Sequence, residues 1–119
     1  ILTCGILTEQ ALAAAEQLAQ THTAVRVVKL NRTAPLDMDA VCAALDGAKH
    51  LVVLEDQLRQ GCVGQRLAAA LLERGAAPEK LRLLNVGETP PAQGSVTQLY
   101  RALGLDADGV SAAVREVLA

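Results

Sequence analysis

Apolar residues recur along the chain with two different periods, and these predict alternating strands and helices. Short runs rich in aliphatic and β-branched residues predict buried strands, and these runs are Ile1–Cys4, Ala24–Leu30, Leu51–Leu54 and Leu81–Val86. Helical spacing of apolar residues predicts helices between and after them, over Thr8–Leu18, Met38–Leu45, Val63–Arg74, Ser95–Leu103 and Ala107–Leu118. Thr8 and Ser95 are the expected N-caps of their helices, and Asp37 directly precedes another.

This alternation, with short connections, is typical of a mostly parallel sheet covered on both faces. We therefore predict a single domain over residues 1–119. We expect a three-layer α/β fold, with a mostly parallel sheet of about five strands and helices on both faces. Tyr100 is the only aromatic residue, so the core must be filled by Leu, Val and Ala side chains.

Charge and composition exclude several classes of function. The net charge is −2 and the basic residues are scattered, whereas a nucleic-acid surface needs a basic stripe. No apolar run approaches the ~20 residues of a membrane helix. We expect neither a nucleic-acid nor a membrane partner. The chain opens inside an apolar run without a charged leader, which suggests a piece of a longer protein.

Three cysteines without paired spacing do not indicate a disulfide framework or a metal site. Buried reduced thiols in a cytoplasmic protein are the expected state of Cys4, Cys42 and Cys62. At the start of a helix, Cys62 is a candidate for a lowered pKa, although no histidine partner is evident. His22 and His50 stand alone at the ends of elements, and an N-cap role explains Ser95 better than a nucleophile role.

The richest candidate site follows the third strand, because open parallel sheets bind ligands at the carboxyl ends of their strands. The segment Glu55–Gly64 carries two carboxylates, Glu55 and Asp56, and two glycines, Gly61 and Gly64. One hypothesis is an anion site at the helix N–H groups or an acid/base pair. The other, which we favour, is that the glycines permit a tight turn and close contact between helix and sheet. The segment lacks the lysine of a phosphate-binding loop.

Taken together, the ordered segments resemble the C-terminal domain of the transketolase-type thiamine-diphosphate enzymes, and within them the 1-deoxy-D-xylulose-5-phosphate synthases. The resemblance covers nearly the whole chain. It rests on Ile1–Gly5, Pro35–Asp37, Leu51–Asp56 with Gly61–Gly64, Leu84–Gly87 and Leu103–Asp106. Two segments depart from the family: Gly61-Cys62 replaces consecutive glycines, and Glu88–Gly94 lacks the usual Pro-Asp-x-Phe.

The resemblance implies a parent enzyme that condenses pyruvate with glyceraldehyde 3-phosphate in isoprenoid precursor synthesis. In such families a Gly-Asp-Gly segment with a later Asn holds the thiamine diphosphate and Mg²⁺, and a Glu of another domain activates the cofactor. This chain has none of these, so we assign it no catalytic, cofactor-binding or metal residue. The implied role is structural: packing against cofactor-binding domains, upstream or on a separate chain, within a homodimer. We expect Glu55, Asp56, Gly61 and Gly64 to lie in the contact loop, so that a bulky residue in place of Gly64 weakens assembly.

Three alternatives remain open at this point. The chain could be the equivalent domain of a transketolase or of a pyruvate dehydrogenase β-type subunit, which have the same architecture and different substrates. It could be a free-standing α/β domain that binds a small ligand at its strand ends. It could also be one subunit of a split enzyme with a separately encoded partner.

Overall fold

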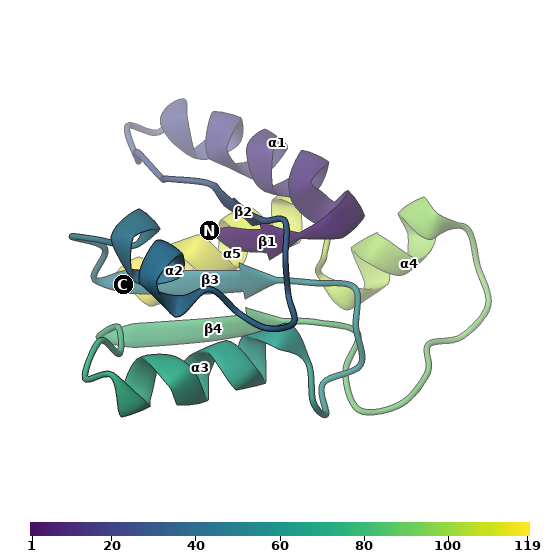
Figure 1. Ribbon diagram of the computed structural model, residues 1–119. Helices are drawn as coiled ribbons and strands as arrows, with labels where there is room; N and C mark the ends of the chain where they lie inside the picture. Colours follow the sequence, from purple (N-terminus) through teal and green to yellow (C-terminus); the bar gives the residue numbers. More distant parts are fainter.

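A computed structural model describes residues 1–119, and its centre is a sheet of parallel strands (Figure 1). The strands are β1 (Leu2–Cys4), β2 (Val28–Leu30), β3 (His50–Leu54) and β4 (Lys80–Leu84). Their order is β2-β1-β3-β4, and every neighbouring pair is parallel. The α/β class is confirmed, but the sheet has four strands and not about five, because the chain after β4 forms a proline-containing loop and then only helices.

Helices cover both faces of this sheet, as the alternating pattern predicts. They are α1 (Thr8–Ala19), α2 (Met38–Ala44), α3 (Val63–Glu73), α4 (Val96–Leu103) and α5 (Ala107–Leu118). A short 3-10 turn, Gly5–Leu7, joins β1 to α1. One face is packed by α1 and α5 and the other by α2 and α3, while α4 projects beside the carboxyl ends of the strands (Figure 1). None of these helices has the length and apolar character needed to cross a membrane.

The central strand β3 is buried on both faces. Leu51 and Val53 belong to the cluster that contains α2 and α3 residues, whereas Val52 and Leu54 pack against α1 and α5. Successive side chains of a strand point to opposite faces, so a continuous apolar run serves two layers at once. The prediction of a two-sided strand is confirmed.

The helix ends follow the capping signals with one exception. Asp37 accepts a hydrogen bond from the Ala40 N–H at 3.1 Å, and Ser95 forms a reciprocal capping box with Gln98. Thr8 was expected to be an N-cap, and this is wrong. Its hydroxyl donates to the Gly5 carbonyl at 2.8 Å, because the preceding 3-10 turn already continues into α1.

The second strand is shorter than its sequence predicts. The β-branched run begins at Ala24, yet β2 begins only at Val28. β2 is an edge strand and its one neighbour is β1, which begins at Leu2, opposite Val28. Residues 24–27 therefore have almost no neighbouring strand with which to form a ladder.

We predict that the two leucines of α3 differ sharply in their contribution to stability. Leu67 is fully buried, whereas Leu72 on the same helix is 71% exposed. Leu67→Ala should lower the free energy of unfolding by about 3 kcal/mol through lost burial and a residual cavity. Leu72→Ala should change it by less than about 0.5 kcal/mol. Urea denaturation of both variants measures the difference, and equal losses would show that α3 does not pack as described.

Candidate functional site

The candidate site lies at the carboxyl ends of β1 and β3. The strand order β2-β1-β3-β4 places β2 and β3 on opposite sides of β1, so the connections leave the β1–β3 pair in opposite directions. In open α/β sheets this reversal is where ligands bind. The 3-10 turn Gly5–Leu7 follows β1, and the predicted contact loop, Glu55–Gly64, follows β3 and leads into α3.

Glu55 occupies the place that a bound anion would take. Its side chain is only 1% exposed. One carboxylate oxygen, Oε1, accepts a hydrogen bond from the Val63 N–H at 2.9 Å, and Oε2 accepts one from the Gly64 N–H at 2.6 Å. The N-terminus of a helix attracts negative charge through its free N–H groups and its dipole. The protein therefore satisfies the start of α3 with its own carboxylate.

Gly64 makes this contact possible because it brings α3 unusually close to the sheet. A Cβ atom at Gly64 would lie 2.9 Å from Leu83 Cδ2 and 3.0 Å from Glu55 Oε2, so the side chains of Leu83 and Glu55 would both have to shift. Gly61 has a different reason to be glycine: its φ of +71° belongs to the left-handed region, which disfavours other residues. The interpretation that these glycines serve a turn and a close approach is confirmed.

The rest of the contact loop is tied to the loop that follows β4. The Glu55 N–H donates to the Leu84 carbonyl at 3.0 Å, continuing the β3–β4 ladder. Further along, the Arg59 N–H donates to the Gly87 carbonyl at 2.8 Å and the Val86 N–H donates to the Gln57 carbonyl at 2.9 Å. The contact loop is thus held on both sides, by α3 and by the chain after β4.

The two acids of the loop have separate environments. Glu55 is buried, whereas Asp56 is exposed and its charge reaches α4. Burial raises the pKa of Tyr100 on α4, and the charge of Asp56 adds to this rise. A general acid or base must have an oxygen within hydrogen-bond reach of the proton that it transfers. Both carboxylate oxygens of Glu55 instead accept hydrogen bonds from backbone N–H groups. Glu55 and Asp56 therefore do not form an acid/base pair.

The cysteines of the site are protonated and not activated. Burial raises the pKa of Cys62, and the charge of Glu55 adds to the rise, although N–H groups of α3 oppose it. Burial also raises the pKa of Cys4, with contributions from Glu55, Asp56 and Cys62. The prediction of a lowered pKa at Cys62 is therefore wrong, because burial, and after it the charge of Glu55, outweighs the effect of the helix N–H groups.

The remaining candidates do not extend the site. His22 lies in the exposed turn after α1 and His50 lies at the start of β3, at the far end of the sheet. Ser95 caps α4. No three His, Cys, Asp or Glu side chains lie close enough together to hold a metal ion. Sequence reasoning missed the role of Glu55 in anchoring α3. The pattern that could have indicated it is an acidic residue at a strand end, nine residues before a glycine in the next helix.

Comparison with known proteins gives the family. A model of the transketolase C-terminal domain matches residues 1–110. The chain belongs to the transketolase C-terminal domain family. It is 32% identical over 118 residues to the 1-deoxy-D-xylulose-5-phosphate synthase of Syntrophotalea carbinolica, covering 99% of this chain and 18% of that enzyme. It is 36% identical over 118 residues to the synthase of Chlorobium phaeovibrioides, covering 97% of this chain and 18% of that enzyme.

A solved structure agrees with this assignment. A "split gene transketolase, inactive beta4 tetramer" superposes with a TM-score of 0.83 at 28% identity, covering 98% of this chain and 38% of the other. The resemblance inferred from the ordered motifs is confirmed. This transketolase C-terminal domain spans about a fifth of the length of the curated relatives it matches.

We predict that removing the charge of Glu55 destabilises the domain, whereas the same change at its neighbour does not. Glu55→Gln replaces one carboxylate oxygen by an NH2 group, so one of the two N–H groups loses its acceptor and the other keeps only a neutral one; the free energy of unfolding should fall by about 2 kcal/mol. Asp56→Asn alters an exposed side chain and should change it by less than about 0.5 kcal/mol. Urea denaturation compares the pair. Equal stabilities would mean that the carboxylate does not anchor α3.

A second prediction concerns thiol reactivity. Raised pKa values leave less thiolate at a given pH, and the thiolate is the reactive form. At pH 8, Cys4 and Cys62 should react with iodoacetamide more slowly than in the urea-unfolded chain, because less of each thiol is ionised. The midpoint of their rate against pH should lie above that of an ordinary cysteine. Mass spectrometry of the labelled peptides measures both, and fast labelling of Cys62 below pH 8 would contradict the raised pKa.

Proposed function

We propose that this chain is the non-catalytic C-terminal domain of a thiamine-diphosphate-dependent 1-deoxy-D-xylulose-5-phosphate synthase. In this role it packs against the cofactor-binding domains of the enzyme and contributes to a homodimer. The parent joins pyruvate to glyceraldehyde 3-phosphate and releases carbon dioxide. Support for this parent comes from the similarity to synthases along almost the entire chain. The transketolase match, at 28% identity, supports the same domain type.

The observation that carries the non-catalytic role is the filled helix terminus at the site. Glu55 takes the N–H groups of α3. At the start of α5, Gln10 accepts from the Ala107 N–H at 2.9 Å and Asp106 from the Gly109 N–H at 2.9 Å. These helix N-termini are the places where an anion would bind at the carboxyl ends of the strands. Side chains of the protein itself already accept their hydrogen bonds.

The cofactor and metal of the family do not fit the residues of this chain. A diphosphate would need free N–H donors or basic groups, and Glu55 places a negative charge where it would bind. Mg²⁺ would need several oxygen ligands, and no acidic cluster of three is present. Thiamine diphosphate and Mg²⁺ therefore belong, in this proposal, to other domains of the enzyme.

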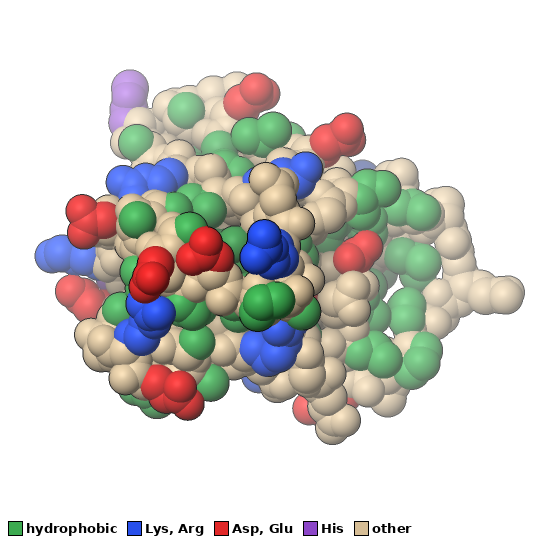
Figure 2. Space-filling model, viewed as in Figure 1, with side chains coloured by type: hydrophobic (Ala, Val, Ile, Leu, Met, Phe, Trp, Pro, Cys, Tyr) green, Lys and Arg blue, Asp and Glu red, His purple; other side chains and the backbone are tan.

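The surface that meets those domains is proposed to be the carboxyl-end surface, defined here by Ile6, Leu58 and Val96. These side chains are 65%, 43% and 60% exposed, and each follows the carboxyl end of a strand. Helix α4 has no buried residue. Hydrophobic side chains gather over α4 in Figure 2, whereas charged ones are concentrated over α2 and α3. The chain is about a fifth of the length of its relatives. We therefore propose that this surface binds the remaining domains of the same enzyme.

The test introduces a charge on this surface in the full-length enzyme. Leu58→Asp and Val96→Asp should each weaken dimerisation and lower synthase activity at least about tenfold, because a buried unpaired charge is costly. Leu72→Asp, at an exposed leucine of α3 away from this surface, is the matched control and should change neither. Analytical ultracentrifugation and turnover of pyruvate with glyceraldehyde 3-phosphate provide the readouts.

Two results would contradict the proposal separately. Intact assembly and activity in both aspartate variants would remove the carboxyl-end surface from the interface. Turnover of a keto acid by the 119-residue chain alone, or micromolar binding of thiamine diphosphate to it in calorimetry, would contradict the non-catalytic role. Micromolar binding of thiamine diphosphate would favour a free-standing ligand-binding domain.

A further inference from the structure

The part of the chain between β4 and α5 is weakly attached to the rest of the domain. Residues 88–104, which we call the α4 strap, comprise a loop and helix α4, and none of them is buried. Two of its side chains, Tyr100 and Leu103, pack inward, and both are only partly buried against the cluster that contains Leu54 and Leu105. Figure 1 shows the strap leaving the body of the domain and returning to it.

Hydrogen bonds hold the α4 strap only at its two ends. Just before it, the Gly87 carbonyl accepts from the Arg59 N–H at 2.8 Å, and just after it, the Leu105 N–H donates to the Tyr100 carbonyl at 2.8 Å. Every other hydrogen bond of the strap joins two of its own residues. Leu105 is also fully buried, so both ends are fixed and the stretch between them is held by packing alone.

Helix α4 satisfies its own ends. The Ser95 hydroxyl accepts from the Gln98 N–H at 3.2 Å, and the Gln98 side chain accepts from the Ser95 N–H at 3.0 Å. At the other end Gly104 adopts the left-handed conformation, with a φ of +70°, that commonly terminates a helix. Undocking of α4 therefore loses the packing of Tyr100 and Leu103 but no hydrogen bond to another helix or strand.

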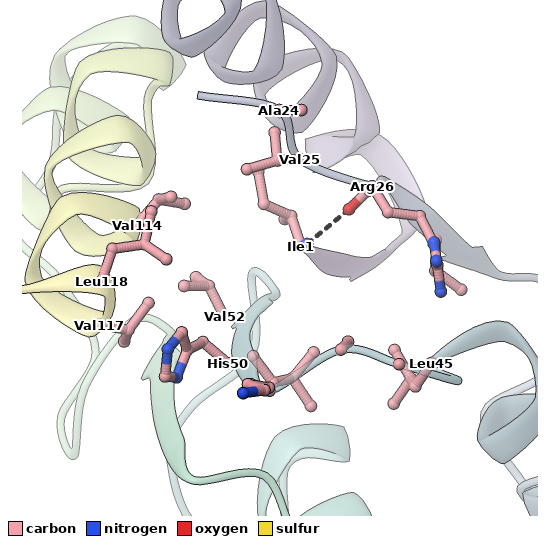
Figure 3. Close-up of a pocket in the computed structure, with 15 residues that line it drawn as sticks. Ile1, Ala24, Val25, Arg26, Leu45, His50, Val52, Val114, Val117 and Leu118 are labelled. Carbon is pink, nitrogen blue, oxygen red and sulfur yellow. Dashed lines mark hydrogen bonds between the residues drawn. The ribbon is translucent and has the colours of Figure 1, made fainter. Parts of the chain in front are cut away.

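Helix α5 is attached in the opposite way. Five of its residues are buried. Figure 3, a view of the cavity at the amino end of the sheet, shows Val114 and Val117 of α5 pointing towards Val52 of β3. Each fully buried aliphatic side chain stabilises the docked helix, and α4 has none. The two helices adjoin in sequence, yet only α5 is anchored in the core.

We propose that the α4 strap is a conformational device that opens as a unit while the sheet stays folded. On opening, Tyr100 and Leu103 leave the cluster that contains Leu54 and Leu105. The helix then unfolds, because its eight residues are too few to persist as a helix in water without packing. Regions with few buried apolar contacts are the ones that open at the lowest free energy.

Assembly of the enzyme closes the strap. This step rests on the proposed function, in which the carboxyl-end surface binds the remaining domains. The large apolar residues of α4 follow helical spacing and form one stripe along it: Val96, Leu99, Tyr100 and Leu103. Tyr100 and Leu103 are the inward part of this stripe, and Val96, which is 60% exposed, is the part left for another domain. Contacts on both sides then hold α4 in place.

Hydrogen–deuterium exchange of the 119-residue chain tests the opening. Relative to their unstructured rates, the helix amides of α4 should exchange at least about a hundredfold faster than the amides of α3 and β3. Tyr100→Ala weakens the docking of α4 and should speed exchange of its amides about fivefold, without changing β3. Leu67→Ala, in the core, is the matched control and should speed exchange in β3 without changing α4.

Two results of this measurement would overturn the proposal. One is equal protection of α4 and β3, which would mean that α4 opens only when the whole domain unfolds. The other is an equal acceleration of both elements by Tyr100→Ala, which would mean that the docking of α4 and the folding of the sheet are one event.

Trypsin gives a second test with a matched pair of sites. Arg101 on α4 and Arg115 on α5 are both exposed arginines within helices, and a protease cuts inside a helix only when the helix opens. Trypsin should cut after Arg101 at least about tenfold faster than after Arg115 under native conditions. Tyr100→Ala should raise the first rate and not the second. Equal rates at the two arginines would contradict separate opening of the strap.

The same exchange measurement on the full-length enzyme tests closure. The α4 amides should exchange at least about tenfold more slowly there than in the 119-residue chain. Val96→Asp should remove this difference, and an aspartate in the first turn does not weaken the helix itself. Equal exchange in enzyme and chain would overturn closure by assembly. Failure of the proposed function would show instead as intact assembly of the Val96→Asp enzyme, and failure of the opening would show in the 119-residue chain.

Discussion

The contact between the Glu55 carboxylate and the first N–H groups of α3 is the constraint on which the carboxyl end of this domain depends. A buried carboxylate is costly unless each oxygen has a hydrogen-bond partner, and here both oxygens have one. The helix backbone lies close to the strand end, and a Cβ atom at Gly64 would displace the carboxylate and the neighbouring Leu83. One acid and one glycine thus fix the direction of α3, the shape of the contact loop and the closeness of the second layer to the sheet.

The same contact decides what the site can do. A reversal of strand connections with a helix starting beside it is a common place for a phosphate. The side chain of Glu55 already accepts hydrogen bonds from the first N–H groups of α3, so an external anion finds no free donor there. The raised pKa values of Cys4 and Cys62 have the same origin, because burial and the carboxylate both favour the neutral thiol. The thiols of this region are therefore held in their less reactive, neutral form.

The sequence predicts the elements well because their signals are local. Asp37 and Ser95 cap helices through side chains that reach only three residues along the chain, and β3 is recognisable from four consecutive apolar residues. The role of Glu55 could not be predicted in this way, since its partners depend on how α3 returns to the sheet. For the same reason the helix start makes Cys62 only a candidate for a lowered pKa: the helix start is local in sequence, but the burial and the neighbouring charge that raise the pKa are not.

The edge strand β2 is shorter than its sequence predicts because of its place in the sheet. Its residues 24–27 have strand-forming character but almost no neighbour, and a ladder needs two strands whatever the propensity of one.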